Sequence, residues 1–140
     1  MKSAVRDVFA DTAFWIGLVV KQDQFHDQAQ RWSLRITGRI TTTAAVLLET
    51  ANALSRPAWR AHGVALIEHL QRRADVNVIE FSSDLWRRGW DLYRQRPDKD
   101  WSLTDCISFE AMQDAKLVDA LTTDDDYRQA GFRALLLEDS

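Results

Sequence analysis

The sequence predicts a three-layer α/β sandwich in which helices flank a mostly parallel central sheet. Short apolar runs alternate along the chain with stretches of helical periodicity, and such alternation is typical of parallel strands joined by crossover helices. The length of 140 residues suits one compact domain, and the chain contains neither an internal repeat nor a linker rich in glycine and serine. We therefore expect a single domain spanning residues 1–140.

The first part of the chain is expected to contain two strands and three helices. The apolar run that ends at Ala10 predicts a strand at 5–10, buried on both faces. Helical spacing of apolar residues begins directly after this strand, and a second such pattern covers 25–32. A brief strand at 39–43 then precedes a helix at 44–55, which is rich in alanine and leucine and ends before Pro57.

The middle of the chain adds two helices and one strand. A helical pattern covers 60–73, and apolar residues at 76–79 predict a strand. The residues of this helix expected to face inward are Val64, Ile67 and Leu70. One of the two serines at 82 and 83 caps the next helix, which ends at Pro97.

The last part of the chain is expected to repeat the alternation. Ser102 begins a helix that runs through Ala115, and a strand follows at 118–121. One or two helical turns come next and are stopped by Gly131. The apolar residues at 134–137 predict a final strand.

The composition argues against several classes of protein. A formal net charge of −3 does not suit binding of nucleic acid through a broad basic surface, although arginines are grouped in pairs along the chain. The only cysteine, Cys106, excludes an intrachain disulfide bond. The apolar stretch at 14–20 is too short to cross a bilayer and no cleavage signal follows it, so we expect a cytoplasmic protein that does not bind membranes.

Four acidic residues are expected to meet at one edge of the sheet. Asp11 and Asp124 directly follow strands, while Glu49 and Asp105 lie near the beginnings of helices. In open parallel sheets, ligands bind beyond the carboxyl ends of the strands, and right-handed crossovers bring these ends to the same edge. The topology therefore brings the four carboxylates toward one place.

Each of these acids also has an ordinary structural explanation. Asp11 or Thr12 could cap the first helix, the segment 102–105 resembles a capping box, and Asp124 could cap the helical turn after it. Glu49 could be an exposed helix residue, but it lies in one of the least polar stretches of the chain. An unpaired carboxylate buried there would be costly, and a bound cation would relieve that cost.

The residue types favour a hard metal ion. Clustered carboxylates prefer oxygen-seeking cations such as Mg²⁺ or Mn²⁺. The three histidines, His26, His62 and His69, lack the His-Glu-x-x-His spacing of a zinc site. We therefore expect magnesium or manganese and not zinc.

Four segments around these acids form a set of motifs. They are residues 9–12 followed by 14–16, residues 47–54, residues 101–109, and residues 121–124 together with Tyr127 and 131–132. The set covers nearly the whole chain and is similar to the PIN domain, and within that family to the VapC-type toxins of bacterial toxin–antitoxin pairs. The third segment is the most specific of the four.

This resemblance implies an endoribonuclease, the toxin of a type II toxin–antitoxin pair. Its catalytic, metal-binding residues would be Asp11, Glu49, Asp105 and Asp124, holding one or two Mg²⁺ or Mn²⁺ ions. Asp126 is a candidate fifth ligand, and Thr12 and Asn52 would orient carboxylates or water. The partners that the resemblance implies are an RNA substrate, a cognate antitoxin and a second copy in a homodimer.

The six tryptophans are numerous for this length, and most are expected in the core. Trp15 and Trp59, together with Leu54 and Ala58, are candidates to line a groove for an apolar segment of the antitoxin.

Two other functions agree with parts of the pattern. A PIN fold whose acids only cap helices would bind RNA or a partner protein without catalysis. An α/β phosphotransferase or phosphatase would use Asp11 as its nucleophile. The residues after it are Thr12 and Ala13, without a second aspartate two positions on, which argues against this last class.

Overall fold

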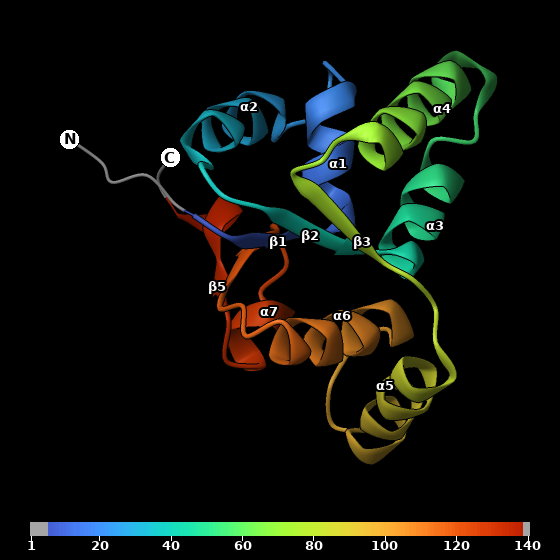
Figure 1. Cartoon of the computed structure of the whole chain (residues 1–140), viewed down its shortest axis with the longest axis vertical. Coiled ribbons are helices and arrows are strands. Elements are labelled where there is room, and N and C mark those ends of the chain that lie inside the picture. Colours follow the sequence, from blue (N-terminus) through green and yellow to red (C-terminus); the bar gives the residue numbers. More distant parts are fainter. Residues whose placement is uncertain (1–5, 139–140) are drawn as a thin grey trace.

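The computed structural model describes residues 6–138, which form a five-stranded parallel sheet with helices on both faces (Figure 1). The strands are β1 (Val8–Ala10), β2 (Ile40–Thr43), β3 (Val76–Ile79), β4 (Asp119–Leu121) and β5 (Arg133–Ala134). The helices are α1 (Thr12–Val19), α2 (His26–Arg35), α3 (Ala44–Ala53), α4 (Pro57–Arg72), α5 (Ser83–Gln95), α6 (Leu103–Asp114) and α7 (Asp126–Gln129), and a short 3₁₀ helix, η1 (Leu135–Leu137), follows β5. The predicted three-layer α/β architecture is confirmed.

The strand order is β3-β2-β1-β4-β5, and every pairing is parallel. Helices α1, α2 and α4 lie on one side of the sheet, and α5, α6 and α7 lie on the other (Figure 1). The chain runs outward from β1 to β3 and then returns to place β4 on the other side of β1. The direction of winding therefore reverses between β1 and β4, and the carboxyl ends of strands at such a reversal are the usual place for a ligand.

The core follows from the apolar strands and the helix faces that cover them. All three residues of β1 are buried, and Phe9 packs its ring against Tyr127. Strand β2 is buried although three of its four residues are threonines, and the hydroxyl groups of Thr42 and Thr43 form hydrogen bonds. Thr42, for example, donates a hydrogen bond to the carbonyl of Ala10 at 2.9 Å. A polar strand is thereby accommodated at the centre of the sheet.

The expected strand at 134–137 is wrong. Strand β5 contains only Arg133 and Ala134, and the next three residues form η1. Leu135 and Leu136 are both buried, whereas consecutive residues of a strand point to opposite faces. The 3₁₀ turn lets both leucines pack at the sheet edge, which is why an apolar run alone predicted the wrong element. At the other end of the chain, the first residue of the expected strand 5–10, Val5, lies outside the described residues.

The inward face of α4 differs from the prediction in part: Leu70 is buried as predicted and Ile67 is half-buried, but Val64 is not buried. The buried residues are Gly63, Leu66 and Leu70, whereas Val64 is 52% exposed. A Cβ atom at Gly63 would lie 3.2 Å from the Cβ of Leu54. The glycine lets α4 approach the end of α3 closely, so this face turns inward in place of Val64.

The tryptophans divide into buried and exposed sets. Trp15, Trp32 and Trp101 are buried, whereas Trp86 and Trp90 are exposed and Trp59 is half-buried. Trp15 is fully buried and therefore cannot line the predicted groove for an antitoxin segment, whereas Leu54 borders a hollow between α3 and α4. Over residues 6–138, no helix combines the length and the apolar character that a membrane span requires.

Candidate active site

The site is built where β1 and β4 end side by side. Asp11 follows β1, and its backbone N–H donates to the carbonyl of Leu121 at the end of β4, at 3.1 Å. Its side chain is 6% exposed and accepts a hydrogen bond from Thr122 Oγ1 at 2.8 Å. Asp11 is also the N-cap residue of α1, but its side chain makes no capping hydrogen bond. The carboxylate is thus oriented from β4 and not by the helix that it precedes.

Asp105 is placed by the capping box at the beginning of α6. Ser102 Oγ accepts from the backbone N–H of Asp105 at 3.0 Å, and Asp105 Oδ2 accepts from the backbone N–H of Ser102 at 3.2 Å. A helix cap and a site residue are therefore not alternatives at this position. One carboxylate oxygen of Asp105 takes part in the cap, and the side chain still lines the pocket.

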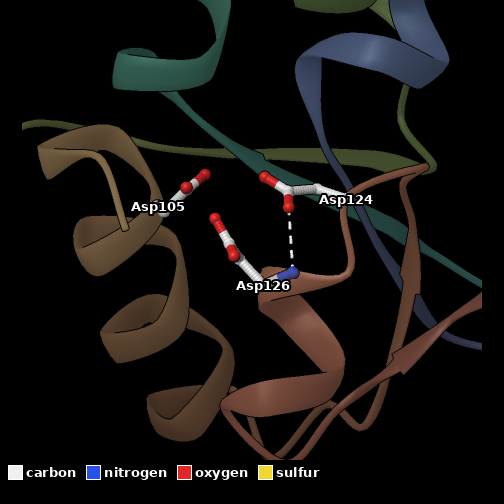
Figure 2. A group of neighbouring side chains, drawn as sticks. All are labelled: Asp105, Asp124 and Asp126. Atoms are coloured by element: carbon white, nitrogen blue, oxygen red, sulfur yellow. Dashed lines mark hydrogen bonds between the residues drawn. The ribbon is translucent and has the colours of Figure 1, made fainter. Parts of the chain in front are cut away.

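Asp124 and Asp126 come from the turn that joins β4 to α7. Asp124 Oδ1 accepts from the backbone N–H of Asp126 at 2.9 Å, and the Asp124 N–H donates to Thr122 Oγ1 at 3.1 Å. Figure 2 shows the side chains of Asp105, Asp124 and Asp126 pointing toward a common space. One carboxylate oxygen from each lies within 4.8 Å of the others, which is close enough for all three to hold one metal ion.

Glu49 reaches the same place from α3. Glu49 is exposed, as the alternative of an exposed helix residue had it, so the cost of burying an unpaired carboxylate does not arise here. Thr12 Oγ1 donates to Glu49 Oε1 at 2.6 Å and fixes the carboxylate from the first turn of α1. Thr12 therefore does orient a carboxylate of the site.

These acids line one open pocket of about 640 Å³. We call it the acidic pocket, and its lining residues are Asp11, Thr12, Ala13, Ile16, Glu49, Asp100, Ser102, Asp105, Thr123, Asp124, Asp125 and Asp126. All four acids predicted from strand ends and helix beginnings are present, together with Asp126. Asn52 is not in this lining and instead borders a neighbouring apolar hollow.

Asp100 also lines the acidic pocket and was missed by the sequence analysis. It lies in the loop before α6, two residues ahead of the N-cap Ser102. Loop residues carry no periodicity that would predict their direction. The only available signal was closeness to the most specific of the four motifs.

Burial and crowding of like charges change the acidity of this group. Burial raises the pKa of Asp11 to about 6, and the neighbouring charge of Glu49 adds to the shift. Burial followed by the charge of Asp11 raises the pKa of Asp105 to about 7. The pKa of Asp126 is raised as well, first by burial and then by the charge of Asp124. Around neutral pH these groups hold negative charge at a free-energy cost.

The donor set fits a hard divalent cation. The side-chain ligands that the described part of the lining offers are carboxylate and hydroxyl oxygens, and no lysine or arginine among them neutralises the acids. A divalent cation would remove the repulsion and make the pocket attractive to phosphate. The acidic group is thus able to hold a metal ion on grounds of geometry and of charge.

The family of the protein follows from its sequence as a whole. The sequence profile of the PIN domain matches residues 8–133. The chain belongs to the PIN-domain family. The resemblance inferred from the four motifs is therefore confirmed.

Solved structures support the same assignment. The chain is similar to VapC20 of Mycobacterium tuberculosis, a toxin that cleaves the sarcin–ricin loop, with a TM-score of 0.85 and 26% sequence identity over 91% of this chain and 98% of that one. It also shares its fold with a chain of VapBC2 from Rickettsia felis, solved bound to a DNA fragment of the promoter, with a TM-score of 0.63 and 10% identity over 90% of this chain and 93% of that one. A search of curated protein sequences gave no match.

Proposed function

We propose that this PIN-domain protein is a metal-dependent endoribonuclease and the toxin of a type II toxin–antitoxin pair. The observation that carries the proposal is the acidic pocket, in which Asp11, Glu49, Asp105 and Asp124 converge from four separate parts of the chain together with Asp126. RNA as the substrate class follows from the family and from the similarity to VapC20, a toxin that cleaves an RNA loop.

In this proposal the metal ligands are Asp105, Asp124 and Asp126, with Asp11 and Glu49 completing the site. A bound Mg²⁺ or Mn²⁺ ion supplies polarisation of the phosphate and a lowered pKa for a bound water. The chain itself supplies the positioning of the carboxylates. Thr122 orients Asp11, Thr12 orients Glu49, and the capping box orients Asp105.

These hydrogen bonds hold the carboxylates in place before a cation or substrate arrives. The three donors belong to the backbone or to short side chains with few rotatable bonds, so ordering them costs little entropy. Such partners around metal-binding carboxylates typically strengthen metal binding by an order of magnitude or more. Asn52 borders the next hollow, where it lies beside Glu49, and we propose that it acts on that residue.

The remaining parts of the proposal concern partners and location. We expect a cognate antitoxin to inhibit the enzyme, a homodimer to be the form in solution, and the cytoplasm to be the site of action. Expression of the chain alone should arrest bacterial growth, and co-expression with the product of an adjacent small reading frame should restore it.

Cleavage of RNA tests the catalytic part. The purified protein should cut RNA in the presence of Mg²⁺ or Mn²⁺ and stop when EDTA is added. Asp11→Asn and Asp105→Asn should each reduce the rate by at least about a hundredfold, since each removes a charge from the metal site. Asp75→Asn is the matched control, because Asp75 forms an exposed ion pair with Arg73 away from the pocket. Unchanged cleavage in both site variants would show that the acidic pocket is not the active site.

A non-catalytic PIN protein is the second candidate function. Two hydrogen bonds favour it, because in each a carboxylate of the pocket serves the fold. Asp105 accepts from the backbone N–H of Ser102, and Asp124 accepts from the backbone N–H of Asp126. Calorimetric titration with Mn²⁺ separates the candidates. Binding that Asp126→Asn abolishes supports the nuclease, and absence of site-dependent binding supports a module whose acids serve only the fold.

A further inference from the structure

Helix α5 packs one face on α6 and carries an exposed row of aromatic residues beside that face. On the packed side, a Cβ atom at Gly89 would lie 2.6 Å from Ile107 Cγ1, so the two helices approach closely there. Beside this face lie Trp86, Trp90 and Tyr93, which are 48%, 44% and 45% exposed. Their spacing of four and three residues places them along one line of the helix surface. We call these three residues the aromatic ladder.

The rings of the aromatic ladder are nearly parallel. The centroids of Trp86 and Trp90 are 6.4 Å apart with an angle of 10° between planes, and those of Trp90 and Tyr93 are 5.7 Å apart with an angle of 26°. Three large aromatic side chains exposed in a row are unusual on a soluble domain and mark a surface that binds something. Bases of a single RNA strand also stack with parallel planes, so the ladder matches their orientation.

Helix α5 is held firmly in place beneath the ladder. The guanidinium of Arg88 bonds to Asp114 at 2.6 Å and to Glu110 at 3.2 Å, both on α6, and to Asp84 of its own helix at 2.9 Å. These ion pairs and the close contact at Gly89 fix the helix on α6. A ligand that stacks on the ladder therefore meets a surface that is already ordered, which reduces the entropic cost of binding.

Both ends of the aromatic ladder open toward the acidic pocket. Tyr93 lines a hollow of about 600 Å³ that also contains Asp100 and Ser102, and these two residues line the acidic pocket as well. At the other end, Trp86 lines a hollow that it shares with Glu49, another residue of the acidic pocket. A strand lying on α5 is thus adjacent to the proposed site of cleavage.

Cationic side chains lie at the Tyr93 end. The same hollow is lined by Arg94, Arg96 and Lys99, whereas the acidic pocket beside it offers no cation in the described structure. The ion pairs of Arg94 with Asp91 and of Arg96 with Asp98 are exposed and therefore weak, so either guanidinium can bind a phosphate at little cost. Aromatic rings beside cationic side chains are the features that bind single-stranded nucleic acid.

We propose that the aromatic ladder stacks unpaired RNA bases while Arg94, Arg96 and Lys99 bind the phosphates, and that this platform delivers a single strand to the acidic pocket. The inference rests on the proposed ribonuclease function and adds the surface that holds the RNA beside the acidic pocket. Double-stranded RNA does not fit, because its bases are already stacked on one another and paired. The substrate is accordingly a loop or an unpaired segment.

The platform is tested by measuring how an RNA strand binds to variants of the protein that do not cleave RNA. All variants carry Asp11→Asn and are kept in Mg²⁺, and the probe is a fluorescein-labelled oligouridylate followed by anisotropy. Trp86→Leu and Trp90→Leu should each weaken binding by about tenfold, since one stacked base is lost in each. Trp90→Phe keeps an aromatic face and should restore most of the affinity. Trp59→Leu on α4 is the matched control. The ring of Trp59 is half-buried and also lies beside an arginine, since Arg56 Cζ is 5.8 Å from the centroid of the ring.

Three results would overturn the platform. They are unchanged affinity in both leucine variants, an equal loss of affinity for an oligouridylate–oligoadenylate duplex, and a lower molecular mass of the leucine variants in sedimentation equilibrium. The last result would assign the ladder to a contact between two copies of the chain. The binding assay does not depend on cleavage. Failure of the platform is therefore distinguishable from failure of the proposed function, which is tested separately by the cleavage of RNA by the unaltered protein.

Discussion

Asp105 combines a structural and a chemical role in one side chain. The capping box holds one of its oxygens, and crowding by Asp11 and Asp124 adds to burial in raising its pKa to about 7. A capping aspartate at an exposed helix end would instead be stabilised by the positive end of the helix dipole, which lowers the pKa. The raised pKa therefore shows that burial and repulsion outweigh the cap, and this balance is measurable.

Asp105→Asn should make the metal-free protein more stable at high pH. The folded pKa of about 7 lies above the ordinary value of 3.8, so the stabilising contribution of the protonated acid is complete below about pH 4 and is lost as the pH rises through 7. Asparagine keeps the oxygen that accepts from the Ser102 N–H and removes the charge. The gain should be near zero at pH 4 and reach at most about 4 kcal/mol at pH 9, measured by urea unfolding in EDTA.

Asp98→Asn is the control for this measurement. The hydrogen bond from Arg96 lowers the pKa of the exposed Asp98 to about 2, so replacement of Asp98 should give no gain in stability at high pH. If the difference between wild type and Asp105→Asn is the same at pH 4 and pH 9, Asp105 does not titrate in this range and the repulsion inferred from the structure is absent.

At the scale of elements, the sequence predicted what periodicity and capping determine. All four strands up to β4 and the N-caps Ser82 and Ser102 agree with the structure, since each depends on residues close in sequence. The inward position of Val64 on α4 and the strand at 134–137 were wrongly predicted, because each depends on contacts with distant residues. The close contact of Gly63 with Leu54 determines which face of α4 is buried, and the packing of Leu135 and Leu136 determines where β5 ends.

The contact between α5 and α6 depends on a missing side chain, and Gly89→Ala should break it. The added Cβ would lie 2.6 Å from Ile107 Cγ1 and 3.2 Å from Ile107 Cα, and the second of these is backbone that cannot rotate away. We expect a loss of about 1–3 kcal/mol in the free energy of unfolding, measured by urea denaturation. Gly63→Ala is the matched control. Its nearest neighbour is 3.2 Å away, and the gain in helix propensity offsets the crowding, so the two variants should differ clearly.

At the scale of the whole molecule, the net charge of −3 conceals a separation of charge. The acids gather where β1, α3, α6 and the turn after β4 meet, while arginine and lysine lie beside the loop from α5 to α6. The sequence predicted the meeting of Asp11, Glu49, Asp105 and Asp124, because parallel topology brings strand ends together. It gave Asp126 only as a candidate fifth ligand and missed Asp100, because the direction of a side chain in a turn depends on backbone geometry that no pattern records.

This concentration of acids predicts that divalent metal stabilises the whole fold in a pH-dependent way. Mn²⁺ at about a hundred times its dissociation constant should add about 2.7 kcal/mol to the free energy of unfolding, which for a chain of this size raises Tm by roughly 5–10 °C. The rise should be larger at pH 8 than at pH 5, because below their pKa values of about 6 and 7 Asp11 and Asp105 hold protons that the metal must displace. Differential scanning calorimetry with and without Mn²⁺ measures both the rise in Tm and its dependence on pH.

Two variants serve as controls for the location of the metal. Asp126→Asn should lose most of the rise in Tm and Asp75→Asn should keep it, since only Asp126 belongs to the three acids whose oxygens lie within 4.8 Å of one another. An equal rise at the two pH values, or in the two variants, would mean that the metal binds elsewhere on the protein.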